Sequence, residues 1–477
     1  MGAGDGVRLQ VDGRIPDASR QRRRHAQNDS LASIAVSFIM AKEQTATRRR
    51  FLSYLPLTSV APLALTPSSG AAEESPYVTA SQPLPNPRIT FPTDRIPKTA
   101  RPKRIAAITT AYYKYSHADD IITKFIEGYS VVGRTHLPRC RVVSLYVEQF
   151  LPTDIGRGMA TRYKIPLFDT AHAALTLGGS KLAVDGVLLI GEHGIYPYND
   201  KGQHLYPRRR LFDDIVRVFR RSGKSVPVYN DKHFSYSWNH ASWMYKQSKK
   251  LKFPMMAGSS VPVTWRKPAI AVRPNSPLTA ALGVGYGSIE SYGFHTLETM
   301  QTVSEKRKGG ESGIRSVQAI SGQAVWRAAK SGAWDPNLLL ASVKHMPIGR
   351  KLRTVEAIRQ ADPQATVFLI EHTDGFRSAA YLSRGPIHEF GFAGRVRGQR
   401  KPFGCWCPLL KPQRDHFSFL CNHIEVMFRT GKPSYPVERT YSVTGALAAL
   451  LDSDMAEGKR IKTPQLNNIR YQAVADG

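Results

Sequence analysis

Apolar runs and amphipathic stretches alternate along the chain from about residue 103 to residue 262. Continuous apolar runs such as 104–110 and 184–191 are typical of strands covered on both faces, whereas 209–224 carries apolar residues at helical spacing. This alternation predicts a parallel sheet with helices on both faces, in which ligands bind at the carboxyl ends of the strands. The other elements expected here are strands at 140–150, 226–230 and 253–260 and helices at 117–129, 153–165, 169–179 and 237–252.

From about residue 263 the pattern changes to longer strand-like segments. It predicts a second, α+β domain over 263–455 with an open, mostly antiparallel sheet, followed by a tail at 456–477. The glycine-rich string GVGYG at 283–287 has no strand–helix context, and we expect it to be a loop. The expected elements are helices at 295–307, 415–431 and 442–454 and strands at 316–322, 365–375, 378–385 and 387–395.

Composition indicates a folded protein with an unusual charge. The 477 residues are 42% apolar, which suffices for the cores of two or three domains. Lys and Arg number 67 against 37 Asp and Glu, a net charge of +30 that favours anionic partners. The basic residues are scattered, however, and no zinc-finger or RNP1 motif is present, so we expect no nucleic-acid partner.

The first 72 residues have the features of a bacterial export signal. RRRFL at 48–52 precedes a weakly apolar stretch to about Leu65, and small residues follow at 68–72. This order predicts a twin-arginine signal peptide, hence a periplasmic or secreted protein without a transmembrane anchor. The start at Met1 or Met40 is left open, and the proline-rich stretch 73–102 is expected to be an extended arm.

The element order over 103–455 resembles the glucose–fructose oxidoreductase and inositol dehydrogenase family (Gfo/Idh/MocA). The resemblance implies an N-terminal Rossmann-like, doubly wound parallel sheet at 103–262, a C-terminal α+β domain, and hydride transfer between NAD or NADP and a sugar, polyol or related hydroxyl substrate. It also makes the second sheet a candidate surface for a homo-oligomer. The segments that carry it are AVDGVLLIGEHG (183–194), the region 222–260 with Asn-Asp-Lys-His at 230–233, SYGFHTLETM (291–300) and 415–453.

The same resemblance assigns roles to individual residues. Lys232 and His295 take the catalytic positions, where a lysine and a histidine serve proton transfer. A solvated lysine and a core histidine are the structural alternatives for these two positions. The cofactor-binding candidates are Thr109, Lys114, Ser116, Glu148, Gly191, Glu192, His193 and Asp231, and the substrate-binding candidates are Trp265, Arg266 and Glu298; no metal site is predicted.

The turn after the first strand departs from the family pattern. Relatives have a Gly-x-Gly-x-x-Gly loop, whose glycines let the backbone approach a pyrophosphate at a helix N-terminus. Here the turn reads TTAYYKYSHADD (109–120), without a glycine. We expect it to lead into a helix near Ala118, with Lys114, Ser116 and the helix N-terminus as phosphate contacts.

Two further questions stay open in the sequence. Cys405 and Cys407, two residues apart on an expected strand, are either a redox pair or plain buried thiols, and Cys140 and Cys421 are candidates for disulfides. The altered first turn also leaves alternatives to the oxidoreductase. These are a non-catalytic carbohydrate-binding protein, and a lyase, epimerase or glycosidase that uses transient oxidation with a tightly held NAD.

Overall fold

The computed structural model describes residues 77–79, 91–97, 101–131, 133–410 and 414–474. The predicted signal peptide at 1–72 lies outside these residues. The first sheet has five parallel strands in the order β5 (Cys140–Gln149), β2 (Lys103–Ala111), β6 (Gly186–Ile190), β7 (Val228–Asp231) and β8 (Met255–Gly258). The predicted parallel sheet is therefore confirmed. Because the chain passes from β2 to β5 on one side and then crosses to β6 on the other, a topological switch point lies between β2 and β6.

Alternate residues of these strands face two different cores, as the pleat of a strand requires. Ile105 and Ala107 of β2 lie in one core with α2 (Lys124–Glu127), α3 (Gly156–Arg162) and α11 (Asp415–Thr430). Ala106 and Ile108 lie in the other core with α4 (Ala171–Thr176), α5 (Arg208–Ser222) and α6 (Trp238–Lys250). The near-continuous apolar runs in the sequence reflect this coverage of both faces.

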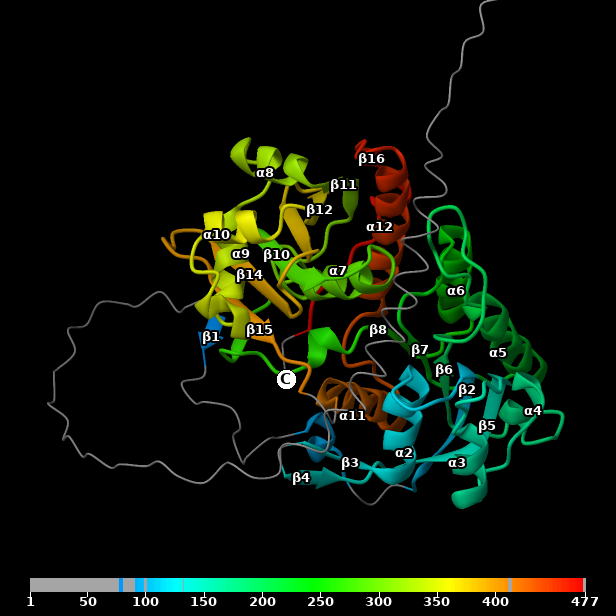
Figure 1. The fold of residues 1–477 in the computed structure, drawn as a ribbon. Coiled ribbons are helices and arrows are strands. Elements are labelled where there is room, and N and C mark those ends of the chain that lie inside the picture. Colours follow the sequence, from blue (N-terminus) through cyan, green and yellow to red (C-terminus); the bar gives the residue numbers. More distant parts are fainter. Residues whose placement is uncertain (1–76, 80–90, 98–100, 132, 411–413, 475–477) are drawn as a thin grey trace, which may run out of the picture. The chain divides into compact units, whose positions relative to one another are not determined.

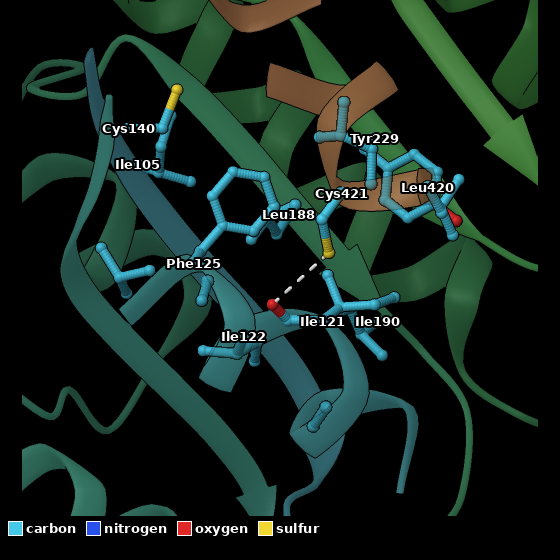
Figure 2. Close-up of a cluster of buried hydrophobic side chains, with 14 of the residues drawn as sticks. Ile105, Ile121, Ile122, Phe125, Cys140, Leu188, Ile190, Tyr229, Leu420 and Cys421 are labelled. Carbon is cyan, nitrogen blue, oxygen red and sulfur yellow. Dashed lines mark hydrogen bonds between the residues drawn. The ribbon is translucent and has the colours of Figure 1, made fainter. Parts of the chain in front are cut away.

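Helix α11 belongs to the core of the first sheet, although it follows the second domain in the sequence. Figure 2 shows Leu420 and Cys421 of α11 among side chains of the first sheet, and the Cys421 thiol lies 3.9 Å from the carbonyl oxygen of Ile121. This packing differs from the predicted division at residue 263. Apolar periodicity indicates that α11 is a helix, but it does not indicate which sheet the helix covers.

The second sheet has seven strands and is mostly antiparallel, as predicted. Its order is β15 (Phe403–Cys407), β14 (Phe390–Val396), β10 (Leu278–Tyr286), β13 (Arg377–Ser383), β12 (Thr366–His372), β11 (Ile314–Ser321) and β16 (Ile461–Lys462), with β10 and β13 parallel. Helices α7 (Ser291–Ser304) and α12 (Val437–Met455) pack on one face. Helices α8 (Gln323–Lys330), α9 (Pro336–Val343) and α10 (Val355–Ala361) pack on the other (Figure 1).

The prediction of a loop at 283–287 is wrong, because most of this segment lies in β10. A Cβ on Gly283 would lie 2.6 Å from the carbonyl oxygen of Thr296 in α7. The glycines therefore allow α7 to approach the strand closely. This contact matters for the site, because α7 carries His295 and Glu298.

The two segments expected to lie outside the domains contribute to them. Within the predicted arm, β1 (Tyr77–Thr79) pairs antiparallel with β9 (Ile270–Val272), and a 3-10 helix at Pro92–Arg95 follows the buried Phe91. Within the predicted tail, β16 pairs with β11. The expectation of a purely extended arm is wrong, since a proline-rich composition does not reveal an anchoring aromatic residue.

All four cysteines are free and buried. Cys405 and Cys407 lie on the predicted strand, and burial together with its neighbour Cys407 raises the pKa of the Cys405 thiol well above its usual value. Among the described helices, none combines the length and apolar character needed to cross a bilayer. The short strands β3 (Tyr129–Val131) and β4 (Arg134–His136) form a separate hairpin.

Candidate active site

The end of β7 and the turn that follows it, together called the β7 turn, carry four polar residues, 230–233, at the carboxyl edge of the first sheet. The side-chain amide of Asn230 donates to the carbonyl oxygens of Asp231 (3.2 Å) and His233 (3.3 Å) and holds the turn from inside. Lys232 has a φ of 66°, and its N–H donates to the carbonyl of Gly258 at the end of β8 (3.2 Å). A left-handed backbone at a lysine is uncommon and often marks a functional site.

Lys232 and His295, which the resemblance pairs, lie in contact. Lys232 Nζ is 2.7 Å from His295 Nε2, and His295 Nδ1 is 2.6 Å from the hydroxyl oxygen of Ser259. Burial, together with the charge of Lys232, lowers the pKa of His295 well below its usual value. With a neutral His295, the Lys232 ammonium donates to Nε2 while Nδ1–H donates to Ser259. This hydrogen-bonded pair joins the end of β7 to α7.

A buried carboxylate completes the surroundings of Lys232. Glu192, which follows β6, lies with Oε1 3.5 Å from Lys232 Nζ and also pairs with Arg208. Arg208 is fully buried, and its Nη1 lies 3.4 Å from His233 Nε2. Burial alone favours the neutral acid, but Lys232 and Arg208 outweigh it and hold the pKa of Glu192 well below its usual value. The lysine is therefore not the solvated surface residue of the structural alternative: its side chain is 7% exposed.

Glu298 lies beneath this pair instead of at a surface that a substrate reaches. It is 1% exposed, and its Oε2 accepts a hydrogen bond from the N–H of Ser259 (3.3 Å). A Cβ at Gly258 would lie 2.6 Å from the same oxygen, so the glycine makes room for the carboxyl group. Burial raises the pKa of Glu298 to about 7. Its contacts are those of a residue that positions Ser259, which in turn bonds to His295.

The turn after β2 follows its predicted course but uses its polar groups internally. The chain leaves β2 at Ala111 and is helical from about residue 117, as expected. The hydroxyl of Thr109 donates to the carbonyl of Ile190 (3.1 Å). Ser116 is fully buried, and its Oγ accepts from the N–H groups of Tyr113 (3.2 Å) and Asp119 (3.3 Å). The Thr109 hydroxyl already donates to a carbonyl oxygen, and the Ser116 hydroxyl is buried against its own turn, so neither predicted hydroxyl is presented to a phosphate.

Acidic side chains occupy the N-terminus of this first helix. Asp119 Oδ2 accepts from the N–H of Tyr115 (2.9 Å) and lies 3.2 Å from Lys114 Nζ. Asp120 pairs with Arg414 at 2.6 Å. The positive end of a helix attracts an anion, and here the chain supplies its own. The residues of this turn therefore do not fit a pyrophosphate bound in the manner of the glycine loop.

Two further cofactor candidates, Glu148 and Gly191, also make their contacts with other residues of the chain. Glu148, near the end of β5, accepts from the Tyr196 hydroxyl (2.8 Å) and pairs with Arg210. Gly191, after β6, allows close packing with Arg208, because a Cβ there would lie 2.7 Å from its side chain. Both residues lie at the carboxyl edge, with structural contacts that explain them.

His193 differs from these residues in keeping an unpartnered polar atom. It has a φ of 70°, and its buried Nε2 makes no hydrogen bond. Its ring lies 5.5 Å from that of Tyr113 and 5.2 Å from that of His117, measured between centroids. Burial, with a contribution from the neighbouring His117, lowers its pKa to about 3, so His193 is neutral. A strained residue with an unsatisfied nitrogen at the switch point is typical of a ligand-binding position.

Trp265 and Arg266 are held by their own surroundings. Trp265 packs on Phe419 of α11, with ring centroids 5.7 Å apart. Arg266 donates to the carbonyl oxygens of Ile270 (2.9 Å) and Pro262 (3.4 Å). These contacts stabilise the loop after β8, and the predicted role of the two residues in substrate binding remains a prediction.

Three residues of the site were absent from the sequence prediction. Ser259 bonds to His295, Arg208 pairs with Glu192, and His117 contacts Asp231. Ser259 was placed inside the strand expected at 253–260, whereas β8 ends at Gly258 and Ser259 directly follows it at the carboxyl edge. Arg208 was hidden in the basic cluster 208–210, and His117 occupies a turn that relatives fill with glycine. Among the described residues, no three His, Cys, Asp or Glu side chains are arranged to hold a metal ion.

No family model and no curated protein matches the chain. One solved structure that matches the chain is a probable dehydrogenase from Thermotoga maritima. The two sequences are 11% identical, the match covers 76% of this chain and 99% of the dehydrogenase, and the TM-score is 0.47. A putative myo-inositol dehydrogenase from Sinorhizobium meliloti 1021 has 9% identity, coverage of 76% and 99%, and a TM-score of 0.45. GenD2 from gentamicin A biosynthesis, in complex with NAD, has 12% identity, coverage of 77% and 99%, and a TM-score of 0.46. Inositol dehydrogenases belong to the family named by the sequence resemblance, but similarities at these TM-scores assign no activity.

Proposed function

We propose that this protein is an oxidoreductase that acts on a hydroxyl group of a sugar, polyol or related small molecule. The observation that carries the proposal is the 2.7 Å contact between Lys232 Nζ and His295 Nε2 at the carboxyl edge of the parallel sheet. In such sheets this edge is where ligands bind. Resemblance in sequence assigned these two residues to one site, and they come from elements 63 residues apart.

The pair suits the removal of a proton from a hydroxyl group. A hydroxyl that is oxidised by loss of a hydride must also lose its proton. In its amine form Lys232 is an acceptor for the substrate proton, and the neutral His295, with Nε2 2.7 Å from Nζ, is placed to pass that proton onward. Ser259 fixes the orientation of the imidazole through Nδ1, and Glu192 keeps a negative charge beside the lysine.

NAD or NADP is the hydride acceptor that the resemblance implies. The unpartnered nitrogen of His193 near Lys232 and Glu192 is compatible with a ligand at the switch point. The turn after β2 lacks the phosphate contacts of relatives, so phosphate recognition by Lys114 or Ser116 is not part of this proposal.

The test combines cofactor analysis with turnover. Ligand released from the purified native protein is identified by mass spectrometry, and NAD+ and NADP+ are titrated into stripped protein by calorimetry. Turnover is then measured at 340 nm with cyclic polyols and aldoses for the wild type, Lys232→Met and the matched surface control Lys249→Met. We expect activity in the wild type and the control and its loss in Lys232→Met. Equal activity in all three proteins would refute the proposal.

The closed turn after β2 favours a second candidate, a non-catalytic carbohydrate-binding protein. Ser116 and Asp119 occupy the groups that would receive a phosphate. Saturable binding of a sugar without binding of either dinucleotide would support this candidate. Turnover without net reduction of NAD(P) would instead indicate a lyase, epimerase or glycosidase that uses transient oxidation.

We further propose that the protein is exported by the twin-arginine route, although the signal lies outside the described residues. Replacing Arg48, Arg49 and Arg50 by lysine is expected to retain the precursor in the cytoplasm, because the export machinery recognises the arginine pair. N-terminal sequencing of the exported protein should place cleavage near Ala71 or Ala72. Unchanged export of the lysine variant would exclude this route.

A further inference from the structure

His117 and Asp231 form a second couple at the same edge of the sheet. His117 Nδ1 lies 2.7 Å from Asp231 Oδ2, and the side chains are 10% and 2% exposed. His117 lies at the start of the helix after β2, whereas Asp231 is the last residue of β7. The two residues are 114 positions apart, and the fold alone brings them together.

The geometry fixes which nitrogen of His117 is available. A carboxylate that accepts Nδ1–H selects the tautomer in which Nε2 is a free acceptor. Nε2 of His117 makes no hydrogen bond with any of the residues that the structure describes. The ring is held in place by edge-on contacts with His193 (5.2 Å) and Phe417 (5.0 Å). Among the described residues, Nε2 of His117 is not one of the buried atoms without a partner, so it is accessible to a ligand or to solvent while Asp231 holds Nδ1.

The second couple lies directly beside the first. Asp231 and Lys232 are consecutive residues, and the left-handed backbone at Lys232 separates their side chains toward different partners, His117 and His295. The consecutive positions of Asp231 and Lys232 therefore place both couples at the carboxyl end of one strand, β7.

We propose that His117, oriented by Asp231, is a second proton-transfer residue, so that the substrate exchanges protons at two positions. This proposal deepens the proposed function and rests on it. At the second position an O–H bond of the substrate breaks, an N–H bond forms at His117 Nε2, and the electron pair stays on the substrate oxygen; the reverse step returns the proton. Asp231 remains a carboxylate and keeps the hydrogen bond from Nδ1–H. The substrate class is a polyol or sugar with neighbouring oxygen groups.

The first test needs no substrate. In protein labelled with 15N at histidine, the nitrogen shifts and couplings report which nitrogen of each imidazole carries the proton. We expect the Nδ1–H tautomer for neutral His117 in the wild type and its loss in Asp231→Asn, whose amide donates to Nδ1. A wild type in which His117 carries its proton on Nε2 would overturn the proposal, whatever the enzyme acts on.

The second test measures turnover on the polyol and aldose panel with NAD+ and NADP+. His117→Gln and Asp231→Asn should each lower kcat by about 10²- to 10⁴-fold, the usual contribution of a general acid or base, and remove one limb of the pH profile. His172→Gln is the matched control, since His172 contacts Arg221 on the far side of α5 from this edge. The titratable groups whose charges act on or are affected by His117 are Asp120, Glu192, His193, Asp231, His295 and His416.

The outcomes separate this proposal from the proposed function. Full activity of both variants, with an unchanged pH profile, would overturn the role of His117 and leave Lys232 and His295 in place. A wild type inactive on the whole panel would refute the proposed function. The proposed catalytic role of His117 and Asp231 would then be refuted as well. If His117→Gln does not fold, the nearly isosteric Asp231→Asn variant and its 15N spectrum decide.

Discussion

The turns after β2 and β7 lie at the same edge of one sheet but treat their polar groups in opposite ways. After β2, the hydroxyl of Ser116 and the carboxylate of Asp119 bond to neighbouring N–H groups of their own turn. After β7, Asp231 and Lys232 bond instead to His117 and His295, which come from other elements.

This difference explains why we place the proposed chemistry at the β7 turn. A turn whose donors and acceptors satisfy one another gains stability and has little left for a ligand. When the side chains of a turn contact residues of other elements, charged groups and imidazoles come together in a buried place. There, burial and neighbouring charges change their pKa values. In this chain Ser116 and Asp119 serve the β2 turn itself, whereas the groups that we propose to be reactive are Lys232 with His295 and Asp231 with His117.

Removing the lysine of the β7 turn should have the largest effect. Lys232→Met is expected to lower turnover at least 100-fold, because the proton of the substrate hydroxyl loses its acceptor. The free energy of unfolding should change by no more than about 2 kcal/mol, because Glu192 keeps its partner Arg208 and is not left as an unpaired buried charge. Steady-state rates at 340 nm and urea unfolding measure the two quantities. A variant that unfolds would show Lys232 to be structural and would remove the contrast between the turns.

Glu298, beneath the β7 turn, should make stability depend on pH. Its folded pKa is raised from 4.5 to about 7, so the folded state binds this proton more tightly than the unfolded state. The resulting stability is fully present below about pH 4.5 and is lost as pH rises through about 7. A shift of this size corresponds to a contribution on the order of 3 kcal/mol.

The variant Glu298→Gln isolates this effect, since it stays neutral at every pH. Relative to the wild type, its free energy of unfolding should rise as pH increases from 4.5 to 8, measured by urea denaturation at several pH values. The exposed Glu356→Gln serves as the control. A constant difference between Glu298→Gln and the wild type would show that Glu298 titrates normally.

Sequence patterns predicted the helices and strands better than they predicted which core each of them packs into. The parallel strands and most helices follow from continuous and periodic apolar runs, because those runs directly record which faces are covered. The placement of α11 and of Phe91 does not follow, because an apolar stripe carries no information about which core it enters. The strand β10 was missed for a related reason: Gly283 and Gly285 signal the close approach of α7, and in the sequence they read as a loop.

The site was predicted only where a resemblance supplied it. Lys232 and His295 came from matching motifs, and the structure brings them into contact. His117 could not be found in this way, because no motif covers the altered turn and its partner Asp231 is 114 residues away. The absence of glycine at 109–120 predicts a backbone that cannot approach a phosphate closely, and this stays a prediction. It did not predict that Ser116 and Asp119 would close the turn.

Ser116 tests whether the β2 turn is structural. Ser116→Ala removes the acceptor of two N–H groups at a helix N-terminus, which should cost about 1–2 kcal/mol of stability. Turnover should change less than twofold, since Ser116 Oγ hydrogen-bonds to neither Lys232 nor His117 and accepts only from N–H groups of its own turn. Thermal unfolding and initial rates measure both, with Ser331→Ala as a surface control. A stable variant with a tenfold lower rate would show that the Ser116 hydroxyl acts in the site and would contradict the contrast.

Replacing Lys114 should have the smallest effect of these substitutions. It tests whether the β2 turn is structural by measuring cofactor binding instead of stability. Its side chain is 64% exposed and pairs with Asp119 at 3.2 Å, an arrangement usually worth less than about 1 kcal/mol. A lysine that bonded to a phosphate of NAD+ or NADP+ would contribute about 1.5–3 kcal/mol to binding, so its removal would weaken the affinity more than tenfold. Because the ammonium of Lys114 already lies against a carboxylate, we expect Lys114→Ala to change the calorimetric Kd for either dinucleotide less than twofold. A tenfold weaker Kd would show that phosphates bind at the β2 turn after all, with Lys114 exchanging Asp119 for the ligand. In that case both turns would be functional, and the internal bonds of Ser116 and Asp119 would describe only the closed form of a cofactor site.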